Sequence, residues 1–112
     1  MRRGEVWWAS LPDPIGSGPE FRRPLLIVQS NDFNQSAIRT VICAVISSNL
    51  RLQRAPGNIR VRARASGLNR DSVVDVSQLI TVHKGLLTER ICRFAPDLMQ
   101  DVDLGIRIVL AL

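Results

Sequence analysis

Short apolar runs alternate with polar connections along the chain, and most of the runs have the length of a β-strand. The pattern predicts strands over residues 5–9, 23–29, 40–47, 59–64, 72–82 and 90–94. The run at 40–47 is apolar throughout, which is typical of a strand buried on both faces. The run at 59–64 alternates strictly, so it predicts a half-buried strand with one exposed row, Arg60, Arg62 and Arg64.

Residues 96–110 carry the one long helical pattern. Pro96 suits the first helical position, and Asp97 places negative charge at the positive end of the helix dipole. One face is apolar and consists of Leu98, Val102, Ile106, Val109 and Leu110. Short helical turns are expected after Ser30 or Asn31 and at 84–87. Five or six short strands with one C-terminal helix predict a mainly β fold with helices, a small, partly open antiparallel barrel.

A long connection rich in proline and glycine, residues 11–22, precedes the second strand. Connections of about twelve residues in small domains are commonly functional. At its end, Pro24 fixes its own φ and drives Arg23 into an extended conformation, which holds a guanidinium at the mouth of a rigid strand. Such a group suits a phosphate, although an ion pair with Glu20 would also explain it.

Size and charge narrow the class of protein. The 112 residues are 46% hydrophobic, which suits one domain spanning residues 1–112. Neither a membrane span nor a signal peptide is evident, so a cytoplasmic protein without membrane contact is expected. The net charge is +5, with 14 arginines and one lysine, and residues 1–70 carry +7 against −2 for residues 71–112. This asymmetry favours an anionic partner, nucleic acid first, although some genomes simply favour arginine.

The reactive side chains exclude several chemistries. His83 is the only histidine, so two-histidine acid–base catalysis within one chain is impossible. Asp101 and Asp103 would point to different faces of a helix, and neither a metal nor a cofactor is expected. Cys43 and Cys92 read as two buried, reduced thiols. The chemistry that remains is that of an arginine acting with a hydroxyl group. Arg23 and Ser47 lie at the ends of two predicted strands and would share a cleft if these strands are neighbours. A hydrogen bond between the Ser47 hydroxyl and the backbone would also explain Ser47.

Several segments taken together resemble the MazF/PemK toxins: residues 3–7, 23–28, 31–32, 41–47, 66–81 and 108–112. The resemblance spans nearly the whole chain. It implies a small SH3-like barrel of the PemK/CcdB type, a homodimer, and metal-independent endoribonuclease activity on single-stranded RNA that leaves 2′,3′-cyclic phosphate and 5′-hydroxyl ends. It also implies a cognate MazE-like antitoxin, through which alone the protein would contact DNA.

The resemblance also implies roles for individual residues. Arg23 takes the place of the family's catalytic arginine and Ser47 that of its catalytic hydroxyl, with Ser48 a close alternative. RNA contacts are expected from Arg22, Phe21, Asn31, Ser72 and Gln78. Ser77 stands where the family often has Glu, so that carboxylate is absent or moved. Trp8 is a candidate for base stacking, with core or dimer packing the favoured reading. The alternative function is that of a non-enzymatic, CcdB-like toxin that poisons a protein target such as gyrase.

Overall fold

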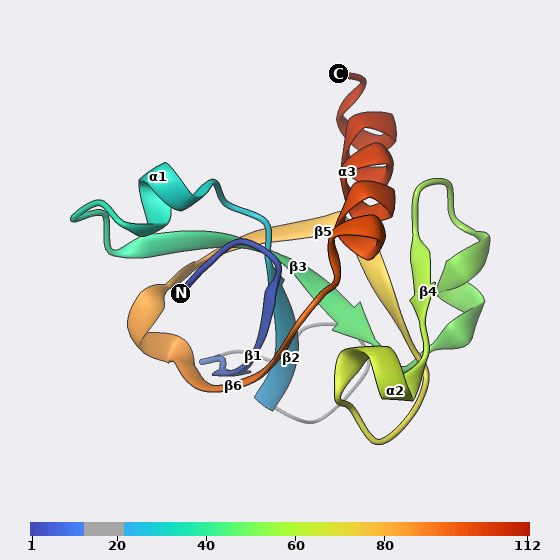
Figure 1. Ribbon diagram of the computed structural model, residues 1–112, viewed down its shortest axis with the longest axis horizontal. Coiled ribbons are helices and arrows are strands. Elements are labelled where there is room, and N and C mark those ends of the chain that lie inside the picture. The colour runs from blue at the N-terminus through green and yellow to red at the C-terminus, as the bar shows by residue number, and fades with distance from the viewer. Residues whose placement is uncertain (13–21) are drawn as a thin grey trace.

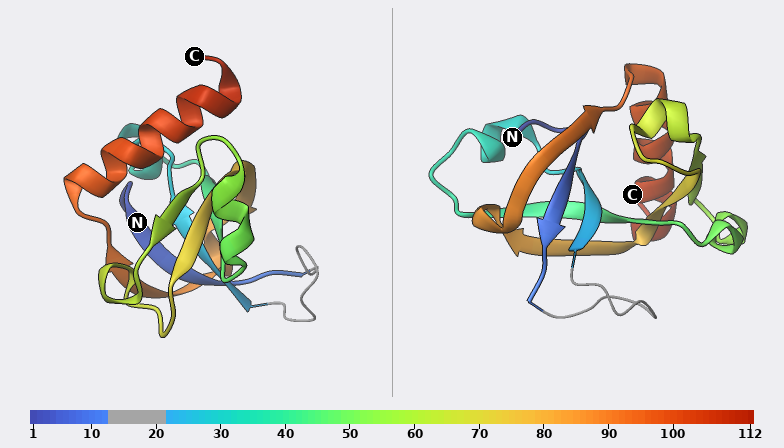
Figure 2. Two further views of the ribbon diagram at one scale, coloured as in Figure 1. Left: turned by 90° about the vertical axis from the view of Figure 1, so that its right-hand side faces the viewer. Right: turned by 90° about the horizontal axis from the view of Figure 1, so that it is seen from below.

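The computed structural model describes residues 1–12 and 22–112, and Figure 1 shows their arrangement. Six strands form one antiparallel sheet in the order β4-β5-β3-β2-β1-β6. Their bounds are β1 Glu5–Ser10, β2 Arg22–Ile27, β3 Thr40–Ser47, β4 Ile59–Val61, β5 Ser72–His83 and β6 Leu87–Arg93. The sheet curls into a half-barrel with the C-terminal helix beside it (Figure 2), which confirms the predicted mainly β fold.

The helices follow local sequence signals. Ser30 caps α1 (Asn31–Asn34) by accepting a hydrogen bond from the Phe33 N–H, as its position before the turn predicts. Helix α3 (Pro96–Leu110) has proline in its first turn and matches the predicted range. Three shorter elements complete the chain: η1 (Leu50–Arg54), α2 (Ala63–Ser66) and η2 (Lys84–Leu86). None of the helices in the described ranges is long and apolar enough to span a bilayer.

Two apolar clusters lie on opposite faces of the curled sheet. In β2, Leu26 joins the cluster that packs under α3, whereas Leu25 and Ile27 join the other. In β3, the side chains from Cys43 to Ile46 alternate between the same two clusters. Both faces of the sheet are therefore buried there, which explains why residues 25–27 and 43–46 are continuously apolar.

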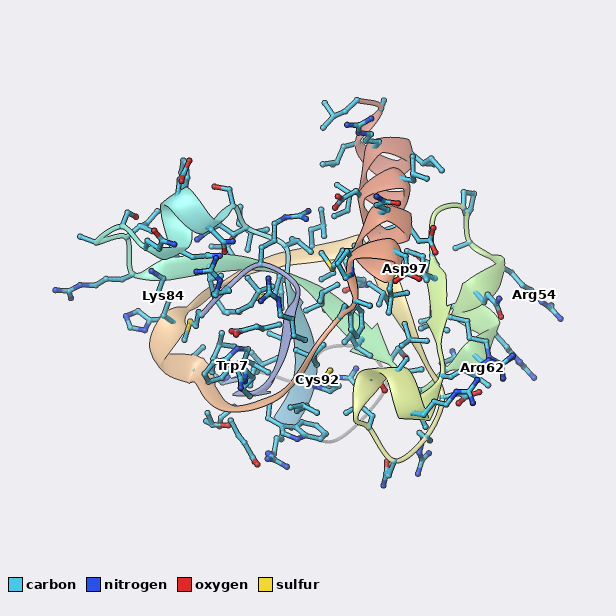
Figure 3. The ribbon with its side chains drawn as sticks, viewed as in Figure 1. Trp7, Arg54, Arg62, Lys84, Cys92 and Asp97 are labelled. Atoms are coloured by element: carbon cyan, nitrogen blue, oxygen red, sulfur yellow. The ribbon has the colours of Figure 1, made fainter. Side chains whose placement is uncertain are left out.

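Three strand predictions differ from the structure by more than one residue. The strand expected at 90–94 is β6, which already begins at Leu87. Strand β4 ends at Val61, and the chain turns into α2 at Ala63, just after Arg62 (Figure 3), so the arginines at 60, 62 and 64 do not form one row. The cause is a distant carboxylate: Asp71 accepts hydrogen bonds from the Ala63 N–H and from Arg60, each at 2.9 Å. Strand β2 ends at Ile27, because the N–H groups of residues 28 and 29 both donate to the Ile42 carbonyl. Residues 13–21, with Phe21, Glu20 and most of the predicted loop, lie outside the described residues.

Candidate functional site

A pocket of about 250 Å³ opens where β1, β2, β3 and β5 end beside the turn that follows α2. Its wall is formed by Trp8, Arg22, Arg23, Pro24, Ile46, Ser48, Leu68, Asn69, Arg70 and Ser72. Three of these side chains are arginines, and none of the described residues that line the pocket is acidic. The pocket therefore combines positive charge with hydroxyl groups, the combination that binds a phosphate.

Strand pairing makes neighbours of the two strands that carry the predicted catalytic residues. In the β2–β3 ladder, Leu25 pairs with Val45 and Ile27 with Cys43. Arg23 and Ser47 lie two residues beyond the last of these pairs, near the ends of β2 and β3. The condition on which the sequence argument depended, that the two strands are neighbours, is therefore met.

The two serines at the end of β3 have different surroundings. Ser48 is exposed and lines the pocket, whereas Ser47 is half-buried and is absent from the pocket wall. The Ser47 Oγ accepts a hydrogen bond from the Asn49 N–H at 3.1 Å. Because that bond uses a lone pair, the Ser47 hydroxyl proton can still be donated. Both hydroxyls thus lie at the same strand end, and either can donate to a phosphate.

Arg22 and Ser72 reach the same pocket from two sides. The Arg22 guanidinium lies over the Trp8 ring, 4.3 Å from its centroid, and donates to Glu89 at 3.3 Å. Ser72 is buried, and its Oγ donates to the Arg70 carbonyl oxygen at 3.3 Å. Two of the predicted RNA contacts therefore lie beside Arg23.

The remaining predicted contacts lie elsewhere. Asn31 lies beyond the opposite end of β2, where its Oδ1 accepts a hydrogen bond from the backbone N–H of Arg3 at 2.7 Å, and it lines a different pocket together with Arg3 and Arg93. Gln78 is exposed on a bulge of β5, between the Asp75–Val45 and Leu79–Ala44 pairs. Gln78 is not among the residues that line the pocket. Phe21 falls in the part of the chain that is not described.

Side chains with other reactive groups are used structurally. The His83 Nδ1 accepts from the Gly85 N–H at 3.0 Å, and Asp103 pairs with Arg3. Burial raises the pKa of the Cys43 thiol to about 12 and also raises the pKa of Cys92, so both remain protonated. Among residues 1–12 and 22–112, no group of three histidine, cysteine or acidic side chains could hold a metal ion.

The sequence did not reveal three neighbours of the pocket. Asn69 and Arg70 approach it on the turn between α2 and β5, and Glu89 approaches it from β6. The sequence marked Trp8 as a candidate for base stacking, but it did not show which strands flank β1. Only the register, in which Trp8 pairs with Pro24 on one side and Glu89 on the other, brings these groups together.

Comparisons with known proteins agree with this geometry. The family model for the PemK-like, MazF-like toxin of type II toxin–antitoxin systems matches residues 2–110. The chain is 46% identical to endoribonuclease MazF6 of Mycobacterium tuberculosis over 112 residues, covering 100% of this chain and 98% of the relative. It is 33% identical to endoribonuclease EndoA of Bacillus subtilis, over 100% of this chain and 96% of that protein.

Solved structures show the same fold. The Mycobacterium tuberculosis toxin MazF-mt6 superposes with a TM-score of 0.79 at 21% identity, covering 96% of this chain and 97% of that one. A mycobacterial endoribonuclease in complex with its cognate antitoxin gives 0.79 at 20% identity, covering 100% and 96%. Because the family model spans residues 2–110 and a relative is 46% identical over the whole chain, the chain belongs to the PemK-like, MazF-like toxins of type II toxin–antitoxin systems.

Proposed function

We propose that this chain is a toxin endoribonuclease that cleaves single-stranded RNA without a metal ion. One observation carries the proposal: β2 and β3 are neighbours, and the strand ends that carry Arg23 and Ser47 lie beside a pocket rich in arginine. Support comes from the curated relatives, which are named endoribonucleases over the full length of the chain. The non-enzymatic alternative, a gyrase-type poison, has no comparable support.

RNA brings its own nucleophile to such a site. The 2′-oxygen adjacent to the bond attacks phosphorus as its proton leaves, the bond from phosphorus to the 5′-oxygen breaks, and that oxygen takes up a proton. The products carry a 2′,3′-cyclic phosphate and a 5′-hydroxyl. Arg23 stabilises the charge that builds on the phosphoryl oxygens, because its high pKa makes it a poor proton donor but a strong electrostatic partner.

The serine hydroxyl orients the phosphate or the nucleophile. Ser47 is favoured because it takes the place of the family's catalytic hydroxyl, and Ser48 is favoured by its exposure to the pocket. Arg22 and Ser72 add phosphate or base contacts from the pocket wall. Phe21, Gln78 and the segment before β2 are proposed as base contacts further along the strand, because single-stranded RNA is read by stacking and by hydrogen bonds to base edges.

The proposed partners follow from the family. A solved relative is described as an endoribonuclease with its cognate antitoxin, and we extend to this chain a MazE-like antitoxin, with DNA contacted only through it. A homodimer is proposed because α3 exposes a run of apolar side chains: Leu104, Ile108, Val109 and Leu110, with Leu112 beyond its end. A cytoplasmic location is proposed because the RNA target and the antitoxin would be there.

The test removes the guanidinium and leaves the fold. In buffer containing EDTA, Arg23→Ala is expected to lose at least about 100-fold in the rate of RNA cleavage, the scale of one lost transition-state contact. Arg39→Gln, which removes an exposed arginine away from the pocket, is the matched control. Full activity in folded Arg23→Ala would reject the mechanism. Ser47→Ala and Ser48→Ala, measured side by side, identify the hydroxyl by which variant is slower.

A further inference from the structure

The Arg22 side chain lies over the ring of Trp8, and both residues line the pocket. Trp8 pairs with Pro24 on β2 and with Glu89 on β6, so all three side chains point to the same face of the sheet. The Arg22 guanidinium lies 4.3 Å from the ring centroid and donates through Nη2 to Glu89 Oε2 at 3.3 Å. A flat, N–H-bearing group is thus stacked on an aromatic ring with a carboxylate at its edge.

A nucleobase has the same three properties. It is planar, it stacks on an indole ring, and cytosine, adenine and guanine each carry an amino group at the edge. Arg22 and Glu89 are 55% and 68% exposed at their side chains, so the ion pair that keeps Arg22 in place is weak. Exchange of the guanidinium for a base would keep both the stack and the hydrogen bond to Glu89.

We infer that Trp8 and Glu89 form a subsite for one nucleobase of the RNA, with Arg22 as the group that occupies it when RNA is absent. The inference rests on the proposed function, since Arg23 of the same pocket would hold the neighbouring phosphate. A carboxylate only accepts hydrogen bonds, so the subsite favours a base with an amino group over uracil. Because Arg22 lies on the wall of the same pocket, its guanidinium can turn from the ring to the RNA backbone when a base takes its place.

The test uses oligonucleotides that cannot be cleaved. Fluorescently labelled 2′-deoxy oligomers of cytosine, adenine and uracil, each about eight nucleotides long, span one single-strand site. By anisotropy, the wild type is expected to bind the cytosine and adenine oligomers about 2- to 12-fold more tightly than the uracil oligomer, the value of one hydrogen bond. Glu89→Gln should reduce this preference. Trp8→Leu should weaken binding of all three oligomers about 5- to 150-fold, and Trp8→Phe much less.

Matched variants separate base recognition from charge and folding. Asp101→Asn removes an exposed carboxylate on α3, and Arg39→Gln an exposed arginine; neither should change the preference among bases. Equal binding of the three oligomers by the wild type, or an unchanged preference in Glu89→Gln, would overturn the inference. The oligomers lack the 2′-hydroxyl, so they measure binding without cleavage. If the protein binds cytosine and adenine oligomers more tightly but does not cut RNA, only the proposed catalysis is rejected. If it cuts RNA but binds the three oligomers equally, only this subsite is rejected.

Discussion

Among the acidic residues that the structure describes, Glu5 is the most buried, and its carboxylate accepts the most hydrogen bonds. It is 4% exposed and accepts from the Arg2 N–H at 2.9 Å, the Trp7 indole at 3.0 Å and Arg90 at 3.2 Å. Burial raises the pKa of this carboxyl, but the hydrogen bonds from Trp7, Arg2 and Arg90 outweigh it and leave the pKa below its usual value. The carboxylate therefore ties the N-terminus and β1 to β6.

This arrangement predicts that replacing Glu5 lowers the free energy of unfolding by an amount that depends on pH. Since the folded pKa lies below the unfolded value near 4.5, the stability that Glu5 contributes is complete above that pH and disappears as the pH falls through the folded pKa. At neutral pH, Glu5→Gln should lower the free energy of unfolding by about 1–3 kcal/mol. Urea unfolding at several pH values should show the gap narrowing in acid. A gap that is constant with pH would contradict the charged role, and Asp101→Asn should change stability by less than about 0.5 kcal/mol.

Among the elements, α3 and the connection before β4 meet backbone to backbone. A Cβ added at Gly105 would collide with the Gly57 carbonyl oxygen, and one added at Gly57 would lie 2.8 Å from the Gly105 carbonyl oxygen. Gly57 also has φ +84, which disfavours any other residue. Gly105→Ala should therefore destabilise the protein by about 1–3 kcal/mol, although alanine is the better helix former.

Thermal or urea unfolding measures this effect directly. Gln100→Ala changes an exposed position on the same helix and should alter stability by less than about 0.5 kcal/mol. If Gly105→Ala were as stable as the wild type, α3 would have room to move away from the connection, and the close contact would not be required.

The sequence predicted the elements where the signal is local. Pro96 and the apolar face of α3 marked the whole helix, and the apolar run 40–47 marked β3 over its full length. The strand predicted at 59–64 begins where expected but ends at Val61, because Asp71, farther along the chain, accepts a hydrogen bond from the Ala63 N–H at the start of α2. The β5 bulge that displaces Gln78 is likewise a property of strand pairing, which one strand cannot reveal.

For the molecule as a whole, the exposed apolar side chains of α3 favour a second copy of the chain as the occupant. Ile108 is 59% exposed and Leu104 is 57% exposed. Large apolar side chains exposed together on one helix are typical of a protein–protein interface. Ile108→Glu should shift the protein from dimer toward monomer in light scattering at micromolar concentration. Gln100→Glu adds the same charge in the first half of the helix and should leave the dimer intact. A wild-type protein that is monomeric under these conditions would reject the dimer.

Much of the proposed site was accessible from the sequence. Pro24 indicated that Arg23 is held in an extended conformation, and the apolar run before Ser47 indicated that a strand ends there. Only the resemblance to known toxins suggested that these two residues act together. The stack of Arg22 on Trp8 beside Glu89 was not predictable, because it joins three strands whose order in the sheet is set by the fold. Asn31 shows the opposite case: it belongs to a shared motif, yet its side chain bonds the Arg3 backbone.

The chemistry of the RNA ends tests the central proposal most directly. The wild type should cut a mixed single-stranded RNA pool in EDTA, and the new ends should be 5′-hydroxyl and 2′,3′-cyclic phosphate. Replacing the ribose before a cleaved bond by 2′-deoxyribose should abolish that cut, because the nucleophile is gone. Cleavage that requires a metal ion, leaves 5′-phosphate ends or persists at the deoxy position would contradict attack by the 2′-hydroxyl assisted by Arg23.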